Sequence, residues 1–240
     1  MPYGHGKPLD IYAPRHAGSS SVVLLWHGAG ADERDVLEPV ARAAAALGVT
    51  VIVPDWQPDT SDGGRAQLLG SVSFTRQRCA AGHGGSPGDH GIVLAGWSRG
   101  GKAAAGLAVS PEAAGGWRPA AVVCLGSGFR SPAPTTGTSP LKDLARTTAS
   151  PVPFWLVHGT KDPVVDPGHS REFAVLLAER GWPTRLEEPP TDHAGVIMAE
   201  YDPQTRRARP AASRDAIEAG QLTARILRAA ASGRQPTADL

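Results

Sequence analysis

The chain has 240 residues and a formal net charge of +1, with 41% hydrophobic and 20% charged residues. A chain of this length can bury one sizeable core, and α/β domains often reach this size undivided. The near-neutral charge argues against nucleic-acid binding, and no apolar run is long enough to cross a membrane. The N-terminus has no apolar signal region, so we expect a cytoplasmic protein with a single domain over 1–231 and a disordered tail over 232–240.

Apolar runs and helical patterns alternate along the chain, which predicts an α/β fold with a mainly parallel sheet and helices on both faces. The run Val22–Trp26 is apolar throughout, as is typical of a central strand buried on both sides. The predicted strands of the first half are 9–12, 22–26, 50–53 and 92–95. The predicted helices of the first half are about 35–47, 65–80 and the segment that ends at 109.

The second half continues the alternation. Its predicted strands are 120–125, 153–157 and 184–187, and its predicted helices are 166–181 and 211–230. Asp166 and Pro167 favour a helix start, because aspartate caps the first turn and proline suits the first helical position. The segment 132–149 is rich in Ser, Thr and Pro and is predicted to be a surface excursion with at most one short helix. Cys79 and Cys124 are predicted to be buried free thiols.

Two stretches match the pattern G-x-S-x-G, in which a serine stands on a sharp strand-to-helix turn. Ser98 follows the apolar run Ile92–Ala95 and precedes a segment of small residues, as this turn requires. Ser86 lies in a glycine-rich loop and is followed by Pro87, which has no N–H to donate to an oxyanion. Ser98 is therefore the predicted nucleophile, and Ser86 is predicted to be a loop residue.

A serine nucleophile needs a base to take its proton, and the base needs a carboxylate to orient it. When the serine stands on such a turn, the acid and then the histidine follow it along the chain. His193 lies in a loop just after the last predicted strand, where the base is expected. His169 falls in the first turn of a predicted helix and is interpreted as a surface residue.

Three aspartates compete for the acid position. Asp162 follows the strand 153–157 and is the best placed. Asp166 already serves as the predicted helix cap, and Asp192 is adjacent to His193, whose side chain points in another direction. Asp162 is therefore predicted to fix the tautomer of His193 and to stabilise its charged form.

Two backbone N–H groups are expected to stabilise the oxyanion that forms during acyl transfer. Arg99, directly after the serine, provides one. The loop His27–Gly30 after the strand 22–26 provides the other, and we assign it to Ala29, with Gly28 as the alternative.

The chain resembles the α/β-hydrolase superfamily, and within it the small carboxylesterases and lipases. The resemblance extends from about Tyr3 to Ala231, and four segments carry it: 27–30, 96–100, 158–162 and 192–195. It implies a serine hydrolase that forms an acyl-enzyme on Ser98, cleaves small or medium carboxylic esters, and needs no cofactor. The sequence has no large insertion after the strand 120–125, so a large lid is not expected, although 132–149 is long enough for a small cap.

Four residues are predicted to contact the small-molecule ester: Gly28, Trp56, Trp97 and Phe129. No metal site is predicted, because the spacing of His83, Asp89 and His90 matches no known ligand pattern. Two other functions remain open for the same scaffold. One is a thioesterase or acyltransferase that uses the same triad, and the other is a binding protein without catalytic activity.

Overall fold

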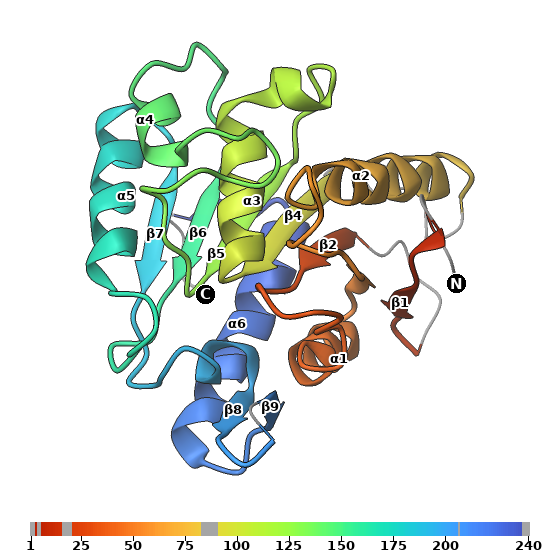
Figure 1. Ribbon diagram of the computed structural model, residues 1–240, viewed down its shortest axis with the longest axis vertical. Helices are drawn as coiled ribbons and strands as arrows, with labels where there is room; N and C mark the ends of the chain where they lie inside the picture. The colour runs from red at the N-terminus through yellow and green to blue at the C-terminus, as the bar shows by residue number, and fades with distance from the viewer. Residues whose placement is uncertain (1–2, 4–5, 16–20, 83–90, 206, 237–240) are drawn as a thin grey trace.

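A seven-stranded sheet forms the centre of the molecule in the computed structural model, which describes residues 3, 6–15, 21–82, 91–205 and 207–236 (Figure 1). The strand order is β1-β3-β2-β4-β5-β6-β7, with β1 antiparallel to β3 and the other pairs parallel. The strands are β1 Leu9–Tyr12, β2 Val22–Trp26, β3 Thr50–Pro54, β4 Ile92–Trp97, β5 Ala121–Leu125, β6 Phe154–Val157 and β7 Thr184–Glu187. The predicted mainly parallel sheet is thus confirmed.

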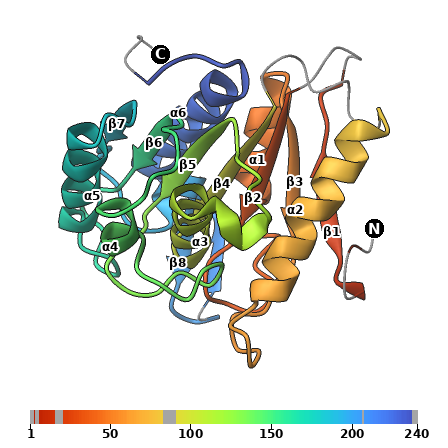
Figure 2. The same ribbon diagram turned by 90° about the horizontal axis from the view of Figure 1, so that it is seen from above.

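Six α-helices in the described residues accompany the sheet: α1 Glu38–Ala46, α2 Arg65–Ala80, α3 Arg99–Val109, α4 Pro140–Leu144, α5 Gly168–Glu179 and α6 Arg214–Ala231. Figure 2 shows α1 and α6 on one face of the sheet and α2, α3, α4 and α5 on the other. Every residue of β2, β4, β5 and β6 is buried, because helices cover these strands on both sides. The carboxyl ends of these four strands all lie at one edge of the sheet.

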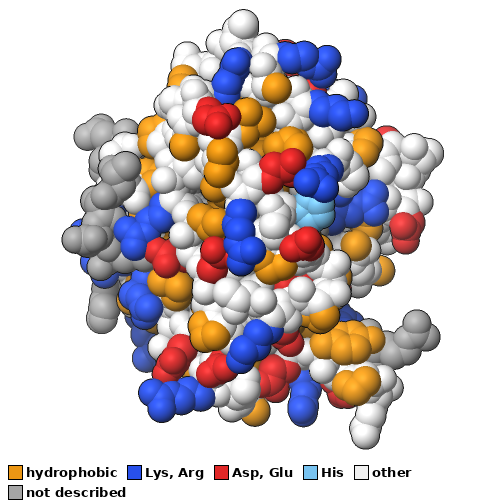
Figure 3. Space-filling view, turned by 90° about the vertical axis from the view of Figure 1, so that its left-hand side faces the viewer, with side chains coloured by type: hydrophobic (Ala, Val, Ile, Leu, Met, Phe, Trp, Pro, Cys, Tyr) orange, Lys and Arg blue, Asp and Glu red, His pale blue; other side chains and the backbone are white. Residues whose placement is uncertain are grey.

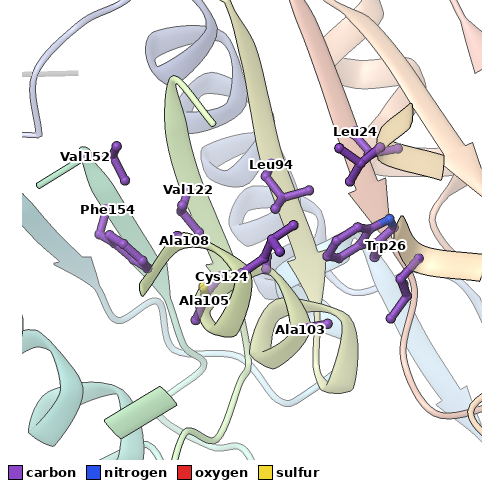
Figure 4. Close-up of a cluster of buried hydrophobic side chains, with 14 of the residues drawn as sticks. Leu24, Trp26, Leu94, Ala103, Ala105, Ala108, Val122, Cys124, Val152 and Phe154 are labelled. Atoms are coloured by element: carbon purple, nitrogen blue, oxygen red, sulfur yellow. The ribbon is translucent and has the colours of Figure 1, made fainter. Parts of the chain in front are cut away.

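Side chains alternate between two core clusters because successive strand residues point to opposite faces. Leu24, Trp26 and Leu94 belong to the cluster between the sheet and α3, which Figure 4 shows in close-up. On α3 the residues facing them are small, including Ala103 and Ala105, so this helix approaches the sheet closely. The first turn of α3 is thereby held firmly at the carboxyl edge of the sheet.

The helix 35–47 was predicted too long, because α1 begins only at Glu38 and residues 35–37 form a turn. The last helix likewise begins at Arg214 rather than at 211. The helix predicted over 166–181 is shorter at both ends, because α5 spans Gly168–Glu179 and Pro167, not Asp166, is at its N-cap. Asp166 still binds the helix start, since its Oδ1 accepts the Gly168 N–H at 2.8 Å. Both cysteines are buried and free, as predicted.

A two-stranded hairpin, β8 Ala199–Asp202 and β9 Arg207–Pro210, was missed by the sequence reading and packs beside α6 (Figure 1). Two short 3₁₀ turns, η2 Pro111–Ala114 and η3 Gly195–Ile197, were also not predicted. Of the predicted tail, residues 232–236 follow α6 and 237–240 lie outside the described residues. None of the described helices combines the length and the apolarity that a membrane crossing requires.

Candidate active site

Ser98 stands on the sharp turn between β4 and α3. Its backbone has φ +54° and ψ −116°, a conformation that L-residues rarely adopt, and α3 begins at the next residue. The Ser98 N–H donates to Leu125 O at 2.8 Å, which ties the turn to the end of the neighbouring strand β5. This geometry is that of the strained strand-to-helix turn that the G-x-S-x-G pattern predicts.

Glycines are required on both sides of this turn because backbone atoms crowd against them. A Cβ added to Gly96 would lie 2.2 Å from the carbonyl carbon of Gly100. A Cβ added to Gly100 would lie 2.4 Å from the carbonyl oxygens of Trp26 and His27, at the end of β2. Only residues without a side chain allow the start of α3 to cross this closely over two strands.

Asp162 and His193 form a hydrogen-bonded pair at the same edge of the sheet. Asp162 follows β6 and His193 follows β7, and His193 Nδ1 lies 2.7 Å from Asp162 Oδ2. The carboxylate is fully buried, whereas the imidazole is 12% exposed. A buried carboxylate bound to Nδ1 leaves Nε2 as the ring nitrogen that can accept a proton.

Four donors surround the Asp162 carboxylate. Besides His193, Oδ1 accepts the N–H groups of Val164 and Val165 at 2.8 and 2.9 Å. His158 Nε2 lies 3.1 Å from Oδ2, and its Nδ1 lies 2.7 Å from the Ser170 hydroxyl. Burial alone would raise the pKa of Asp162, but the hydrogen bonds from His158, His193 and the Val165 N–H outweigh it and hold the pKa well below its usual range.

His158 is a further polar residue of the site, to which the sequence analysis gave no role. It is buried, hydrogen-bonded and directly against the Asp162 carboxylate. Its position immediately after β6, at the same sheet edge as Asp162, is the signal that could have suggested this contact.

The Ser98 turn and the Asp162–His193 pair are joined through two residues. Trp97, next to Ser98, donates from its indole Nε1 to the backbone carbonyl of His193 at 2.9 Å, and the two rings lie 5.1 Å apart. On the other side, a Cβ added to Gly126 would lie 3.1 Å from His193 Nδ1 and 3.5 Å from Asp162 Oδ2. Gly126 follows directly after Leu125, whose carbonyl binds the Ser98 N–H, and its φ is +53°.

The Ser98 hydroxyl itself has no hydrogen-bond partner among the residues that the structure describes. The hydrogen bond between nucleophile and base is often long without substrate and tightens when substrate binds. The contacts of Trp97 and Gly126 hold His193 beside the turn that carries the serine.

The loop after β2 lies beside this turn and offers backbone N–H groups. Within the described part of the chain, no acceptor binds the N–H of Gly28 or Ala29. The Gly30 N–H is already occupied, because it donates to Glu33 Oε2 at 3.0 Å. As the first residue of α3, Arg99 has an N–H without an acceptor inside the helix. The expected oxyanion donors, Arg99 with Ala29 or Gly28, are thus free of other partners.

Glu33 was not singled out from the sequence. Its carboxylate binds the Gly30 N–H and approaches Gly28, where an added Cβ would lie 3.0 Å from Oε2. The same Cβ would lie 3.1 Å from the Trp97 ring. Glu33 and Trp97 therefore fix the shape of this loop from two sides, a role that only the folded arrangement reveals.

Two aromatic residues predicted to contact substrate lie in the core instead. Trp56 is 0% exposed, and its indole N–H donates to the His27 carbonyl at 3.3 Å, so it supports the loop after β2 from behind. Phe129 is 1% exposed and stacks on Phe173 with the ring centroids 4.1 Å apart. Their apolar rings are used for packing, so neither presents a surface to a ligand in this arrangement.

A cavity of about 660 Å³ opens beside Ser98. Its lining comes from the start of α3, the loop after β5 and the loop between β6 and α5. His169, which the sequence suggested to be a surface residue, is half-buried and lines this cavity. Pro132, the first residue of the predicted surface excursion, and its neighbour Ser131 also line it. Helix α4, within that excursion, packs against α3 and α5.

The rival serine Ser86 and the residues His83, Asp89 and His90 lie outside the described residues. Within the described ranges no group of three His, Cys, Asp or Glu side chains is arranged to hold a metal ion.

No protein-family model matches the sequence, and no curated protein matches it either. Solved structures match over nearly the whole chain. An esterase from Pyrobaculum calidifontis is 17% identical with a TM-score of 0.69, and the match covers 97% of this chain and 83% of that one. Esterase 2 of the planctomycete Thermogutta terrifontis, with butyrate bound, is 19% identical with a TM-score of 0.69 over 96% and 91% of the two chains.

The α/β hydrolase MGS-M1, from a deep-sea metagenome library of the Medee basin, is 17% identical with a TM-score of 0.65 over 95% of this chain and 94% of that one. At these identities the likeness concerns the fold, that is, the order of the strands and the placing of the helices.

Proposed function

We propose, on the premise that this chain has the α/β-hydrolase fold, that it is a serine hydrolase of carboxylic esters with small or medium acyl chains. Ser98 is the proposed nucleophile and His193 the proposed base. Asp162 is proposed to orient His193 and to stabilise its charged form. The N–H groups of Arg99 and Ala29 are the proposed oxyanion donors, with Gly28 as the alternative to Ala29.

In the first half of the proposed reaction, the Ser98 hydroxyl attacks the ester carbonyl while His193 Nε2 takes its proton. The negative charge on the carbonyl oxygen is stabilised by the two backbone N–H groups. The imidazolium then gives its proton to the leaving alcohol, and the acyl group stays on Ser98. In the second half, water attacks the acyl-enzyme with His193 as base, which releases the acid and restores the serine.

The observation that carries this proposal is the buried Asp162–His193 hydrogen bond of 2.7 Å beside a serine with φ +54°. A core histidine could form the same pair, but it would not need a strained serine next to it. The structural neighbours support the same chemistry, because one structure of the Thermogutta esterase is phosphorylated by paraoxon and another binds butyrate.

Hydrolysis of p-nitrophenyl butyrate, together with labelling by a fluorophosphonate probe, tests the proposal. Ser98→Ala should lose both signals and keep its fold, as measured by circular dichroism. Ser73→Ala, a serine on the exposed side of α2, is the matched control and should keep both. Full activity in Ser98→Ala would overturn the proposal, and an unlabelled native protein without turnover would favour a binding protein.

The same assay distinguishes hydrolysis from acyl transfer. With a competing alcohol or thiol acceptor present, a hydrolase gives mainly the free acid, whereas a transferase gives mainly the transferred product. Dominant transfer would replace the proposed hydrolysis with the acyltransferase alternative while leaving the roles of the triad unchanged.

A further inference from the structure

The cavity beside Ser98 is lined by more positive than negative side chains. Arg99, Lys102 and Arg130 contribute three cations, and Asp166 contributes the one carboxylate among the lining residues. The cations come from two separate segments, the first turn of α3 and the loop after β5. The fold therefore brings cations from two parts of the sequence together next to the proposed nucleophile.

Two of these cations have no carboxylate partner in the described part of the chain. Arg130 is paired with Glu172, with Nε and Oε2 2.8 Å apart. Asp166 accepts the Gly168 N–H and keeps its single negative charge in the lining. Arg99 makes no ion pair with a described residue, and the Lys102 ammonium donates only to the Ser131 hydroxyl. The two unpaired cations of α3 thus stand against one carboxylate, which leaves the cavity lining with a net positive charge.

Arg99 and Lys102 are three residues apart on one helix, so their side chains lie on the same side of it. Burial and then the charge of Arg99 lower the pKa of Lys102. Like charges on neighbouring side chains repel each other, and an anion bound between them would remove that repulsion.

The positive charge is local to the cavity. The whole chain has a formal net charge of +1, and Figure 3 shows basic, acidic and apolar side chains interspersed over the face that α4 and α5 form. General attraction of anions to the surface is therefore not expected, and the effect of these cations is limited to molecules that enter the cavity.

We propose that the esters this site prefers carry an anionic group, a carboxylate or a phosphate, which binds between Arg99 and Lys102 while Ser98 attacks the ester carbonyl. This inference rests on the proposed esterase function and gives it a substrate class. The anion remains unchanged in the reaction, and its binding holds the ester in the cavity, so that it acts mainly on KM.

Matched pairs of esters test this inference. For an anion on the acyl side, mono-p-nitrophenyl adipate is compared with p-nitrophenyl hexanoate, which has the same number of acyl carbons and no charge. For an anion on the alcohol side, 4-acetoxybenzoate is compared with its methyl ester. We expect kcat/KM for the anionic member of one pair to exceed that for the neutral member by about tenfold at low salt, with the preference falling as ionic strength rises.

The variant Lys102→Gln is expected to raise KM for the preferred anionic ester by about three- to tenfold and to leave kcat and the neutral ester nearly unchanged. Lys142→Gln, which removes an exposed lysine of α4 outside the cavity, is the matched control and should change neither. Equal loss with anionic and neutral esters would assign Lys102 a structural role and overturn the inference.

Failure of this inference differs from failure of the proposed function. Turnover of the neutral esters with no preference in either pair overturns the anion site and leaves the esterase proposal standing. No turnover of any of the four esters, with no fluorophosphonate labelling, overturns both.

Discussion

The two halves of the candidate site are built in different ways. The turn around Ser98 depends on glycines, because Gly96 and Gly100 have no Cβ and let backbone atoms of β4, α3 and β2 come together. The loops after β6 and β7 depend on polar side chains that are present, because four donors converge on the Asp162 carboxylate. The first half is fixed by steric fit and the second by hydrogen bonds and charge.

This difference predicts different responses to substitution. A change at the turn should alter the stability of the whole sheet, since β2, β4 and α3 share it. A change at the carboxylate should alter the chemistry first, since His193 depends on it for its tautomer and orientation.

The largest effect is expected for Asp162→Asn. An amide can no longer stabilise the charged imidazole or fix its tautomer, so kcat should fall by about 10³- to 10⁴-fold. Hydrolysis of p-nitrophenyl butyrate measures this effect. Asp215→Asn, which removes an exposed carboxylate paired with Lys161, is the control and should retain its activity. A loss below tenfold in Asp162→Asn would show that another residue is the acid.

A smaller effect, on stability, is expected for Gly96→Ala. Its methyl group would lie 2.2 Å from the backbone of Gly100, and the strain of moving α3 away should lower the free energy of unfolding by about 3 kcal/mol. Urea denaturation measures the change. Gly70 lies within helix α2, and the methyl group of Gly70→Ala would lie 3.9 Å from the Tyr3 ring, an ordinary contact. This control should therefore be neutral or stabilising by up to about 1 kcal/mol. Equal stability of the two variants would contradict a turn fixed by steric fit.

The smallest effect is the pH dependence of these stability differences. The pKa of Asp162 is lowered in the folded protein, so its contribution to stability is fully present above the unfolded pKa of about 3.9 and is lost as the pH falls through the lower folded value. The stability gap between the native protein and Asp162→Asn should therefore narrow as the pH falls from about 5 to below 4.

The gap for Gly96→Ala has no titrating origin and should stay constant over the same pH range. Urea denaturation at each pH compares the two gaps. A gap for Asp162→Asn that does not narrow in acid would mean that hydrogen bonds to the carboxylate do not stabilise the fold.

Helices and strands could be predicted from the sequence where a short segment has a clear apolar run or a clear helical pattern. The strand Val22–Trp26 and the helix Arg65–Ala80 have the predicted bounds, because a continuous apolar run and a helical pattern are local properties of the sequence. The strands β8 and β9 were missed because Glu200, Asp202 and Arg209 give them a polar composition without a buried face.

The residues of the candidate site could be predicted where they directly follow strands that are recognisable in the sequence. Ser98, Asp162 and His193 follow β4, β6 and β7, and a parallel sheet brings such positions to one edge. The contacts of His158, Glu33 and Trp97 could not be predicted, because each depends on which neighbour lies across a loop. Trp56 and Phe129 were placed in the pocket from sequence adjacency alone, which does not reveal which way a side chain points.

The indole of Trp97 touches the Gly28 loop with its ring and the His193 carbonyl with its N–H. One rigid side chain therefore lies between the loop of the proposed oxyanion donor and the loop of the proposed base, and its size limits how closely the two loops can approach. Since both loops rest on the same ring, neither can shift by itself without losing that contact. A substitution at this one position would therefore disturb both loops at once.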